Sequence, residues 1–407
     1  MASNTEVLVV GAGPAGASAA AWAARQGRSV ILADAARFPR DKACGDGLTP
    51  RAIAELDRLG LGDWLRSRTL NKGVRIRGFG RERLAPWPSG VYPAFGSAVP
   101  RTELDNRVRL AAVASGAEMI EGTPAVDATI DEGRVTSVTF DTDDGPRRIG
   151  CRTLIVADGV RSPLGRRLGR VWHRTTVYGV AARAYMKTPR SEDPWITVQF
   201  EMRDQNRSLL PGYGWVFPLG TGEVNVGVGS LATAKRPSRM ALRPLLERYA
   251  EDLRPEWDFD GGVRALTSAL IPMGGAVSGI AGRNWALIGD AAGCVNPLDG
   301  EGIDYGLESG RLAAELLDEP DLTDTWPAIL RARYGLAFSL ARRVAGIATA
   351  PGVWHAGRPT IHFQRMVDVM LRLMGNLVTD EDRDVVARLW RAGGRASIRL
   401  DSRPPFS

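Results

Sequence analysis

The chain has 407 residues, a formal net charge of +7 and a hydrophobic fraction of 44%, values that exclude a largely disordered protein. This length exceeds the size at which one hydrophobic core stops growing, so more than one packed region is expected. No apolar run reaches the roughly eighteen residues that a membrane-spanning helix requires, which argues against an integral membrane protein.

A buried strand, a glycine-rich turn and a helix are predicted at the start of the chain. The apolar residues 7–10 are typical of a strand buried on both faces, and glycines in G-x-G-x-x-G spacing follow at once. The first glycine permits a tight turn, the second lets a pyrophosphate approach the backbone, and the third lets the helix pack on the strand. A second apolar strand ends in an acid where a ribose ligand is typically found, although a surface carboxylate is the alternative. We therefore predict a dinucleotide site at Gly11, Ala12, Gly13, Pro14, Ala15, Gly16 and Asp34.

A polar loop and a second helix follow this unit. Cys44, Gly45, Asp46 and Gly47 form either a connecting loop whose glycines adopt positive φ, or a backbone cradle beside a flavin ring. Short strand-like pieces over residues 73–98 are interrupted by prolines and are placed to pass over a substrate cavity. Arg101, at the start of a helix predicted over 101–116, contacts either a cofactor phosphate or sugar, or a surface carboxylate.

A second strand-to-turn motif follows a predicted hairpin. Its strands are expected at 135–140 and 151–157, and the second strand ends at Asp158 and Gly159. Between about 171 and 262 the pattern changes to short strands of period two. This pattern predicts an antiparallel sheet inserted into the nucleotide-binding domain.

A third strand-to-turn motif appears where the first domain resumes. A buried strand over 285–288 leads to Asp290, whose carboxylate can accept a ribityl hydroxyl. Gly300, Gly302 and Ile303 then open a helix, and the N–H groups of this turn can bind a pyrimidine oxygen or the ribityl chain. A purely structural strand-to-helix turn is the alternative.

The three turns, in this order, resemble the flavoprotein fold shared by aromatic hydroxylases, flavin halogenases and geranylgeranyl reductases. Narrower motifs resemble the geranylgeranyl reductase family, including actinobacterial members that saturate one isoprene unit of menaquinone. These motifs are Cys44-Gly-Asp-Gly-Leu-Thr-Pro-Arg51, Tyr213-Gly-Trp-Val-Phe-Pro218, Asn225-Val-Gly227 and Asn296-Pro-Leu-Asp-Gly-Glu-Gly-Ile303. Leu210 stands where the family pattern has proline, which leaves the prenyl length open.

The resemblance implies an α/β fold with a Rossmann-like FAD-binding domain of the aromatic-hydroxylase flavoprotein type, an inserted antiparallel β-sheet substrate domain and a helical C-terminal region. We place the discontinuous FAD-binding domain at 1–72, 99–170 and 263–325, the isoprenoid domain at 73–98 and 171–262, and the helical region at 326–407. FAD contacts are implied at the glycine-turn residues and acids named above, at Cys44 to Gly47 and at Arg101. Tyr213 and Trp215 are implied to line an isoprenoid channel.

The implied reaction is FAD-dependent saturation of an isoprene C=C bond in a polyprenyl lipid such as menaquinone. An isolated trisubstituted alkene accepts hydride poorly, so protonation has to lead or accompany hydride transfer from reduced flavin. Trp215 and Tyr213 offer an aromatic face to the developing cation, and Tyr213 or Cys44 offers an acid. Ordinary core packing of the aromatic pair and a plain loop thiol are the alternatives.

A flavin-dependent monooxygenase or halogenase acting on an aromatic small molecule is the alternative function, and a non-catalytic flavin-binding protein is a third. Halogenases carry W-x-W-x-I-P where this chain has Tyr213-x-Trp215-x-Phe217-Pro218, and they depend on a lysine, for which Lys72 is the candidate. The electron donor stays open among NAD(P)H, ferredoxin and a membrane reductant, because no second G-x-G-x-x-G domain is evident.

The sequence also bears on location. Residues 1–6 lack the features of a signal peptide, and Cys44, Cys151 and Cys294 are spaced as reduced thiols of a cytoplasmic protein. With only three histidines, no metal site is expected.

The basic charge favours an anionic membrane surface over nucleic acid, for which no motif is present. The basic apolar stretches 340–347 and 363–374 are either packed helices or a membrane-facing surface, and we expect peripheral attachment to the inner face of the cell membrane.

Overall fold

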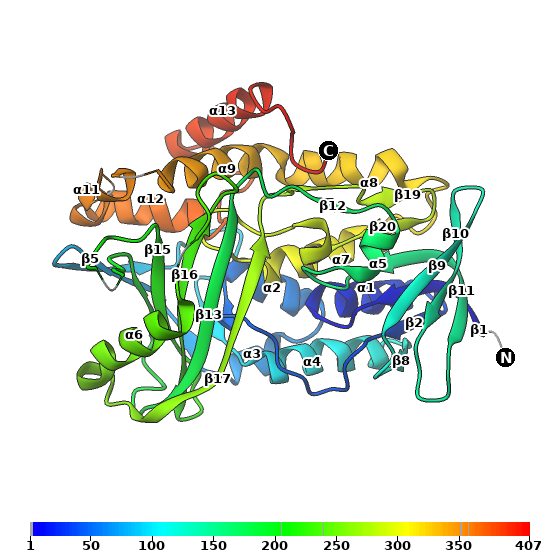
Figure 1. The fold of residues 1–407 in the computed structure, drawn as a ribbon, viewed down its shortest axis with the longest axis horizontal. Coiled ribbons are helices and arrows are strands. Elements are labelled where there is room, and N and C mark those ends of the chain that lie inside the picture. The colour runs from blue at the N-terminus through cyan, green and yellow to red at the C-terminus, as the bar shows by residue number, and fades with distance from the viewer. Residues whose placement is uncertain (1–2, 205, 239, 351, 357) are drawn as a thin grey trace.

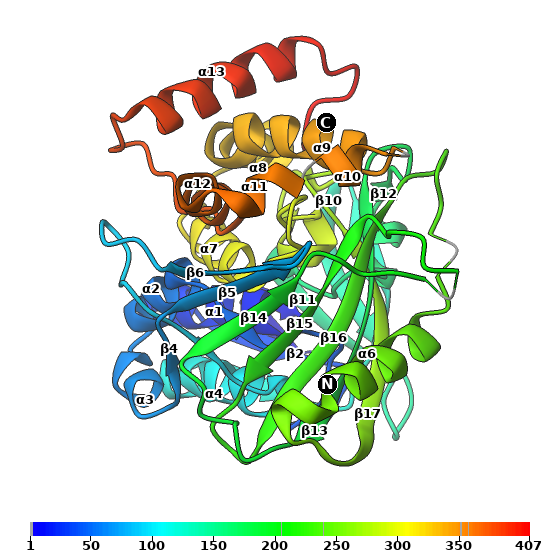
Figure 2. The same ribbon diagram turned by 90° about the vertical axis from the view of Figure 1, so that its left-hand side faces the viewer.

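The computed structural model describes residues 3–204, 206–238, 240–350, 352–356 and 358–407. Two large sheets lie beside each other, and the C-terminal helices extend along one side of both (Figures 1 and 2). This arrangement has the predicted parts: a nucleotide-binding type of domain, an inserted sheet and a helical C-terminal region.

The first sheet is built around the predicted N-terminal strand. Residues 7–10 are at most 5% exposed, because parallel strands flank this strand on both sides and helix α1 (Pro14–Arg25) packs against it. The predicted hairpin is confirmed, since β10 pairs antiparallel with β11. In sheet order the strands are β19 (Ala281–Gly282), β20 (Trp285–Leu287), β11 (Arg147–Val156), β1 (Ser3–Val10), β2 (Val30–Ala33) and β8 (Glu118–Ile120), with β10 (Arg134–Phe140) and β9 (Ala125–Asp131) attached to β11.

Helices α1 (Pro14–Arg25) and α7 (Ile303–Ala314) pack closely, because α7 has glycines, which carry no side chain, where it meets α1. A Cβ at Gly310 would overlap the carbonyl oxygen of Ala15, and Ser18 Oγ donates a hydrogen bond of 2.8 Å to the carbonyl of Leu307. This contact brings the first and third glycine-rich turns together, although almost 290 residues separate them.

The second sheet differs from the predicted antiparallel insert in two respects. Strands β14 and β5 run parallel, because β5 enters from the separate 73–98 segment rather than through a hairpin. The last strand also continues to Pro272, ten residues beyond the expected boundary at 262, because it pairs with β13 along most of its length. In sheet order the strands are β17 (Asp260–Pro272), β13 (Tyr178–Lys187), β16 (Glu223–Ala232), β15 (Gly212–Pro218), β14 (Trp195–Gln199), β5 (Gly73–Gly78) and β6 (Arg81–Pro86).

Helices pack against the second sheet at two places. Helix α6 (Leu242–Trp257) buries Leu246, Tyr249 and Trp257 against one face (Figure 2). At the edge formed by β5 and β6, helices α11 (Arg358–His362) and α12 (Gln364–Met374) bury Ile361 and Val367.

The remaining elements connect these layers. The helical C-terminal region consists of α8 (Leu322–Leu330), the π-helical turn η2 (Arg331–Gly335), α9 (Leu336–Ala348), α10 (Val353–Ala356), α11, α12 and α13 (Val385–Arg399). The other elements are β3 (Gly47–Leu48), α2 (Pro50–Arg58), α3 (Gly62–Arg66), β4 (Leu70–Asn71), β7 (Gly96–Ala98), α4 (Arg101–Ala114), α5 (Pro163–Arg167), β12 (Val171–Trp172), β18 (Val277–Ser278) and η1 (Gly289–Ala292). No helix of the described residues is long and apolar enough to cross a membrane.

Candidate active site

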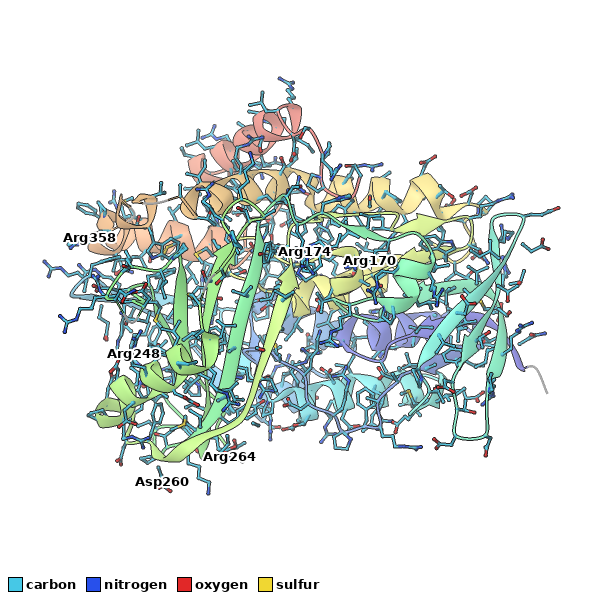
Figure 3. All side chains as sticks on the ribbon, in the orientation of Figure 1. Arg170, Arg174, Arg248, Asp260, Arg264 and Arg358 are labelled. Carbon is cyan, nitrogen blue, oxygen red and sulfur yellow. The ribbon has the colours of Figure 1, made fainter. Side chains whose placement is uncertain are left out.

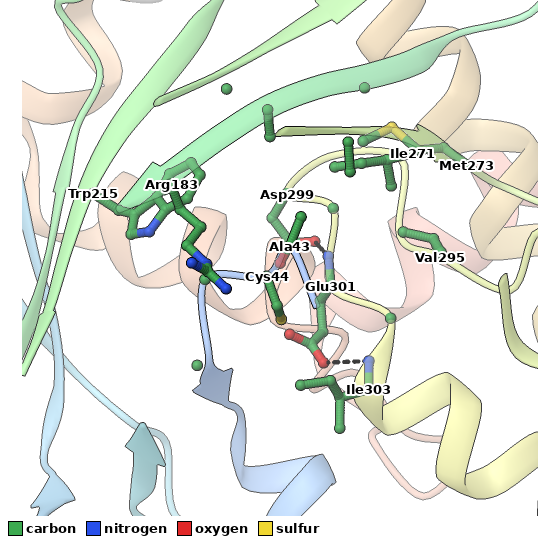
Figure 4. A pocket seen from close by; sticks show the side chains of 18 of the residues that line it. Ala43, Cys44, Arg183, Trp215, Ile271, Met273, Val295, Asp299, Glu301 and Ile303 are labelled. Atoms are coloured by element: carbon green, nitrogen blue, oxygen red, sulfur yellow. Dashed lines mark hydrogen bonds between the residues drawn. The ribbon is translucent and has the colours of Figure 1, made fainter. Parts of the chain in front are cut away.

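A single cavity of about 310 Å³ joins the glycine-rich turns of the first sheet to the aromatic side chains of the second (Figure 4). Its walls are mostly apolar, and polar groups are concentrated where the turns meet. The turns contribute Gly13, Pro14, Ala15, Gly159, Asp290, Gly300, Gly302 and Ile303, and the loop before β3 contributes Cys44, Gly45 and Gly47. The second sheet and the C-terminal helices contribute Phe200, Tyr213, Trp215, Phe217, Trp354, Met370 and Leu371.

The first glycine turn has the shape that a pyrophosphate requires. Gly11 has φ of 102°, and a Cβ there would overlap the carbonyl oxygen of Ala157. A Cβ at Gly16 would overlap the carbonyl oxygen of Gly11, so this glycine sets the approach of helix to strand. At Gly13 the nearest atom to a Cβ is the flexible Nη2 of Arg40 at 3.3 Å, and no side chain caps α1 there. The N-terminus of α1 is therefore open toward the cavity, as anion binding by helix N–H groups requires.

Asp34 lies beside this turn but does not line the cavity. Its Oδ2 accepts a hydrogen bond of 2.6 Å from the N–H of Ala12, and its Oδ1 accepts one of 2.7 Å from the N–H of Ala36. Each carboxylate oxygen has a second lone pair, so the half-buried group can still accept a ribose hydroxyl. Asp34 thus orders the glycine turn in addition to its predicted role.

The third turn places a charge pair at the cavity. Lys42 Nζ lies 2.9 Å from Asp290 Oδ2, and its charge lowers the pKa of Asp290 even though burial acts in the opposite direction. The N–H of Ile303 donates to the Glu301 carboxyl at 2.9 Å, and so it is already occupied. No described residue hydrogen-bonds to the N–H of Gly302, which leaves that group for a ligand.

Two other predicted cofactor residues have strong protein partners. Arg101 is 3% exposed, lines the cavity and forms a two-bond ion pair with Asp105, with distances of 2.6 and 2.8 Å. Asp158 instead accepts hydrogen bonds from Ser162 Oγ and the N–H of Leu164, so it orders the start of α5 and does not line the cavity.

The loop that contains Cys44 is held against β16 by an asparagine. Asn225 Nδ2 donates to the carbonyl of Cys44 and to Asp46 Oδ2, both at 2.9 Å, and Asn225 Oδ1 accepts from Trp215 Nε1 at 2.8 Å. Tyr185 donates to the same Asp46 oxygen at 2.7 Å. Asp46 is fully buried and faces away from the cavity, and burial raises its pKa to about 6. Asn225 therefore fixes Trp215 and the Cys44 loop relative to each other.

A row of aromatic rings runs from the C-terminal helices to this loop. Ring centroids are 6.0 Å apart for Trp354 and Phe200, 6.0 Å for Phe200 and Tyr213, 5.8 Å for Tyr213 and Trp215, and 6.2 Å for Trp215 and Phe217. All five side chains line the cavity. The row gives the cavity a continuous apolar wall suited to an extended hydrocarbon chain.

Two acids, Asp299 and Glu301, line the cavity next to this wall. Tyr213 donates its hydroxyl to the carbonyl of Asp299, and Glu301 accepts hydrogen bonds from two backbone N–H groups. Burial raises the pKa of Asp299 to about 8 and raises the pKa of Glu301 well above its ordinary value. Burial likewise raises the pKa of Cys44, so its thiol is neutral.

Sequence reasoning assigned no role to five residues of this site, Lys42, Tyr185, Asn225, Asp299 and Glu301, although the last three lie within the motifs quoted for the family resemblance. Asn225 carried a usable signal, because a lone amide interrupts the buried valine-rich strand β16. Glu301 lay within a motif that was noticed for its glycines. Lys42 and Tyr185 are recognisable only through partners more than a hundred residues away.

Comparisons with known proteins agree with this geometry. The family model described as "FAD binding domain" matches residues 4–252. The chain is 58% identical over 406 residues to a menaquinone reductase of Mycobacterium tuberculosis, covering 99% of both chains. It is 31% identical to digeranylgeranylglycerophospholipid reductase 1 of Methanopyrus kandleri, covering 81% of this chain and 84% of the relative.

Solved structures share the fold at low identity. A geranylgeranyl bacteriochlorophyll reductase-like protein of Thermoplasma acidophilum superposes with a TM-score of 0.72 at 21% identity, covering 96% of both chains. A flavin-dependent brominase superposes with a TM-score of 0.74 at 18% identity, covering 98% of this chain and 100% of the other. The predicted flavoprotein fold and the FAD cofactor are therefore confirmed, whereas likeness at this identity does not distinguish one flavin chemistry from another.

Proposed function

The chain belongs to the geranylgeranyl reductase family of FAD-dependent oxidoreductases, and on that premise we propose that it saturates an isoprene double bond in the polyprenyl tail of menaquinone or a closely related lipid. The proposal rests on the lining of the cavity. One end is formed by glycine-rich turns fitted to a dinucleotide, and its wall is a continuous row of aromatic rings. A long apolar chain with no charged group to recognise fits such a wall.

FAD fits the residues present. The open N-terminus of α1 beside Gly13 would hold the pyrophosphate, and Asp34, Asp290 and Gly302 offer partners for its hydroxyl and ring oxygens. When bound and reduced, FAD supplies the hydride. The protein's own tasks are to hold the alkene, exclude water, supply a proton and stabilise positive charge on the tertiary carbon.

Cys44, Tyr213 and Trp215 are proposed to act at the alkene. Trp215 is 5% exposed and is oriented by Asn225, so its ring can face a developing tertiary cation without competition from water. The Tyr213 hydroxyl is bound to the Asp299 carbonyl, which fixes the ring as part of the wall. The neutral Cys44 thiol borders both the aromatic row and the glycine turns.

The test of the proposed function is the mass of the lipid quinones. Cells that carry the gene are expected to contain menaquinone two hydrogen atoms heavier than cells from which it is deleted. The purified protein with chemically reduced flavin should form the same product without oxygen, whatever the physiological electron donor. Identical quinone masses in both strains, together with no product in vitro, would contradict the proposal.

No observation favours the halogenase alternative. Lys72, the lysine considered for that chemistry, is exposed and does not line the cavity. Its backbone instead connects β5 to neighbouring loops through hydrogen bonds with Pro194 and Trp87. Lys42 does line the cavity, but it is paired with Asp290.

We further propose peripheral attachment of the helical C-terminal region to an anionic membrane at the inner face of the cell membrane. Large apolar side chains are exposed there, including Ile347 at 55%, Phe363 at 61% and Leu389 at 67%. Basic groups are interspersed with them, among them Arg358 on α11 (Figure 3) and Arg388 on α13. Helix α12 connects this surface to the cavity, since its residues Met370, Leu371 and Met374 line the cavity. A lipid tail can therefore enter beside α12.

The double variant Phe363→Asp with Leu389→Asp should lose most of its binding to vesicles that contain phosphatidylglycerol. Each substitution replaces an apolar contact with an anion that the lipid surface repels. Ile130→Asp is the matched control, because Ile130 is 52% exposed on β9 at the far end of the molecule (Figure 1). Cosedimentation at low and high salt measures the effect. Equal binding by all three proteins would contradict the surface assignment.

Asn225→Ala tests whether the position of Trp215 matters for catalysis. The change leaves Trp215 Nε1 and the Cys44 carbonyl without their hydrogen-bond partner, which should cost about 1–3 kcal/mol of stability. It should also lower turnover at least about tenfold through misplacement of the cavity groups. Asn284→Ala is the control, because Asn284 is equally buried and makes three hydrogen bonds in the β10–β11 region, away from the cavity. It should lose similar stability and retain turnover. If both variants lose turnover equally, the positioning role is wrong.

A further inference from the structure

The loop between η1 and α7 places a carboxyl group in the cavity at the junction of its two ends. Figure 4 shows the side chains of Cys44 and Glu301 converging there, with the Glu301 carboxyl joined to the N–H of Ile303. The same loop reaches the aromatic wall, since Tyr213 donates its hydroxyl to the Asp299 carbonyl. Glu301 is therefore within the part of the cavity that both the glycine turns and the aromatic row border.

One carboxyl oxygen of Glu301 accepts hydrogen bonds from the backbone, and the other accepts none from the described residues. Its Oε1 accepts hydrogen bonds of 2.9 Å from the N–H of Ile303 and 3.2 Å from that of Asp304. No described residue hydrogen-bonds to Oε2. An acid held in this way by its carbonyl oxygen carries its proton on the other oxygen, which is free to face a substrate.

The surroundings favour the protonated form of this acid. Burial and the neighbouring carboxyls of Asp304 and Asp299 raise the pKa of Glu301 well above its ordinary value, against the two backbone hydrogen bonds. Arg51 forms its ion pairs with Asp304 and Glu308, and no ion pair between Glu301 and a cation is present among the described residues. The other titratable and charged groups that line this part of the cavity are Cys44 on its loop, Tyr213 on β15, Arg101 on α4 and the Lys42–Asp290 ion pair beside Gly302.

The two acids considered from the sequence are weaker candidates. The Tyr213 hydroxyl proton is committed to the Asp299 carbonyl, and burial raises the pKa of Tyr213. Burial also raises the pKa of Cys44. A carboxylic acid is intrinsically stronger than either, with a reference pKa near 4.3 against about 8.5 for a thiol and about 10 for a phenol.

We propose that Glu301 is the acid that protonates the isoprene double bond, an inference that rests on the proposed function. The Oε2–H bond breaks, and the π electrons of the alkene form a C–H bond at the less substituted carbon. The tertiary carbon, now positive beside Trp215, receives the hydride that reduced FAD supplies, and FAD is thereby oxidised. The Glu301 carboxylate then regains a proton from solvent, so the net change is addition of H⁺ and H⁻ across the double bond.

Glu301→Gln tests this assignment under anaerobic single turnover with chemically reduced enzyme. The amide retains the hydrogen-bonding shape but has no acidic proton, so the rate of menaquinone reduction should fall at least about 100-fold. FAD content, measured from the absorbance spectrum, should be unchanged. Glu315→Gln, at the residue that caps the C-terminus of α7, removes one exposed carboxylate, which is paired with Arg311, and should keep the wild-type rate.

Two further readouts separate proton donation from a structural role. In deuterated water the wild type should place one deuteron on the less substituted carbon and should react more slowly. In ordinary water the wild-type rate should fall as the pH rises through the pKa of Glu301, because only the protonated form is active. Glu301→Gln should lose this pH dependence in its residual rate. If the wild type reduces menaquinone and Glu301→Gln keeps its rate or its pH profile, this inference is overturned alone; if the wild type forms no product, the proposed function fails and the role of Glu301 fails with it.

Discussion

Gly13→Val should yield a folded protein without bound FAD, whereas the wild type should be yellow and release free FAD on denaturation. Gly13 has extended backbone, with φ of −69° and ψ of −178°, so valine is tolerated by the chain itself. Its side chain would, however, fill the open space beside the N-terminus of α1 that the pyrophosphate requires. The variant should also lose the stability that FAD provides, about 4 kcal/mol when free FAD exceeds its Kd by a factor of about 1,000. Absorbance spectra and thermal unfolding measure both effects.

Two matched glycine variants make this result specific. Gly90→Val adds the same side chain where no atom lies within 4 Å and φ is not positive, so it should retain FAD and stability. Gly16→Val should fail to fold, because its Cβ would overlap the carbonyl oxygen of Gly11. Full FAD occupancy in Gly13→Val would show that the cofactor does not approach this turn.

Trp215→Ala should lower turnover on menaquinone at least tenfold while FAD stays bound. The change removes a cation–π contribution of roughly 1–2 kcal/mol at the developing tertiary cation, which alone corresponds to about a tenfold change in rate. It also opens the aromatic wall between Tyr213 and Phe217. Trp215→Phe keeps an aromatic face but loses the hydrogen bond to Asn225, so its rate should lie between those of the wild type and the alanine variant.

The same assay separates a reductase from a halogenase. Lys72→Ala should keep full activity, because this exposed side chain lies outside the cavity. Product should form without oxygen, and each reduced isoprene unit should add two hydrogen atoms to its mass. Strict dependence on oxygen or on Lys72, or full activity in Trp215→Ala, would contradict the reductase mechanism.

Local features of the site could be predicted because their causes are local. The glycine spacing at 11–16 determines a turn and a helix start wherever a buried strand precedes it, and Gly11 and Gly16 have the turn and packing roles that the motif implies. Period two along β15 places Tyr213, Trp215 and Phe217 on one face, and all three line the cavity. Three such turns in order resemble the flavoprotein fold, this resemblance implies the FAD cofactor, and the relatives confirm both.

Contacts between distant segments depend on register and packing, which no local pattern specifies. Trp215 lies opposite Gly227 and Phe217 opposite Asn225 in the β15–β16 pairing, and this register alone brings the amide of Asn225 to the indole N–H. A side chain at Gly227 would overlap the Trp215 ring. A shift of one residue would place Asn225 on the other face of the sheet.

The sequence by itself therefore determined the three glycine-rich turns and the aromatic pair on β15, because strand periodicity and glycine φ values are properties of short segments, and the family resemblance of these motifs implied the cofactor. The tertiary structure decided which side chains meet: Lys42 with Asp290, Asn225 with Trp215 and the Cys44 loop, and Glu301 with the cavity. It also decided that Asp46 and Asp158 point away from the cavity. Burial raises the pKa of Glu301 only after folding has surrounded it with apolar groups and other carboxyls, so its acid chemistry is a property of the packed molecule.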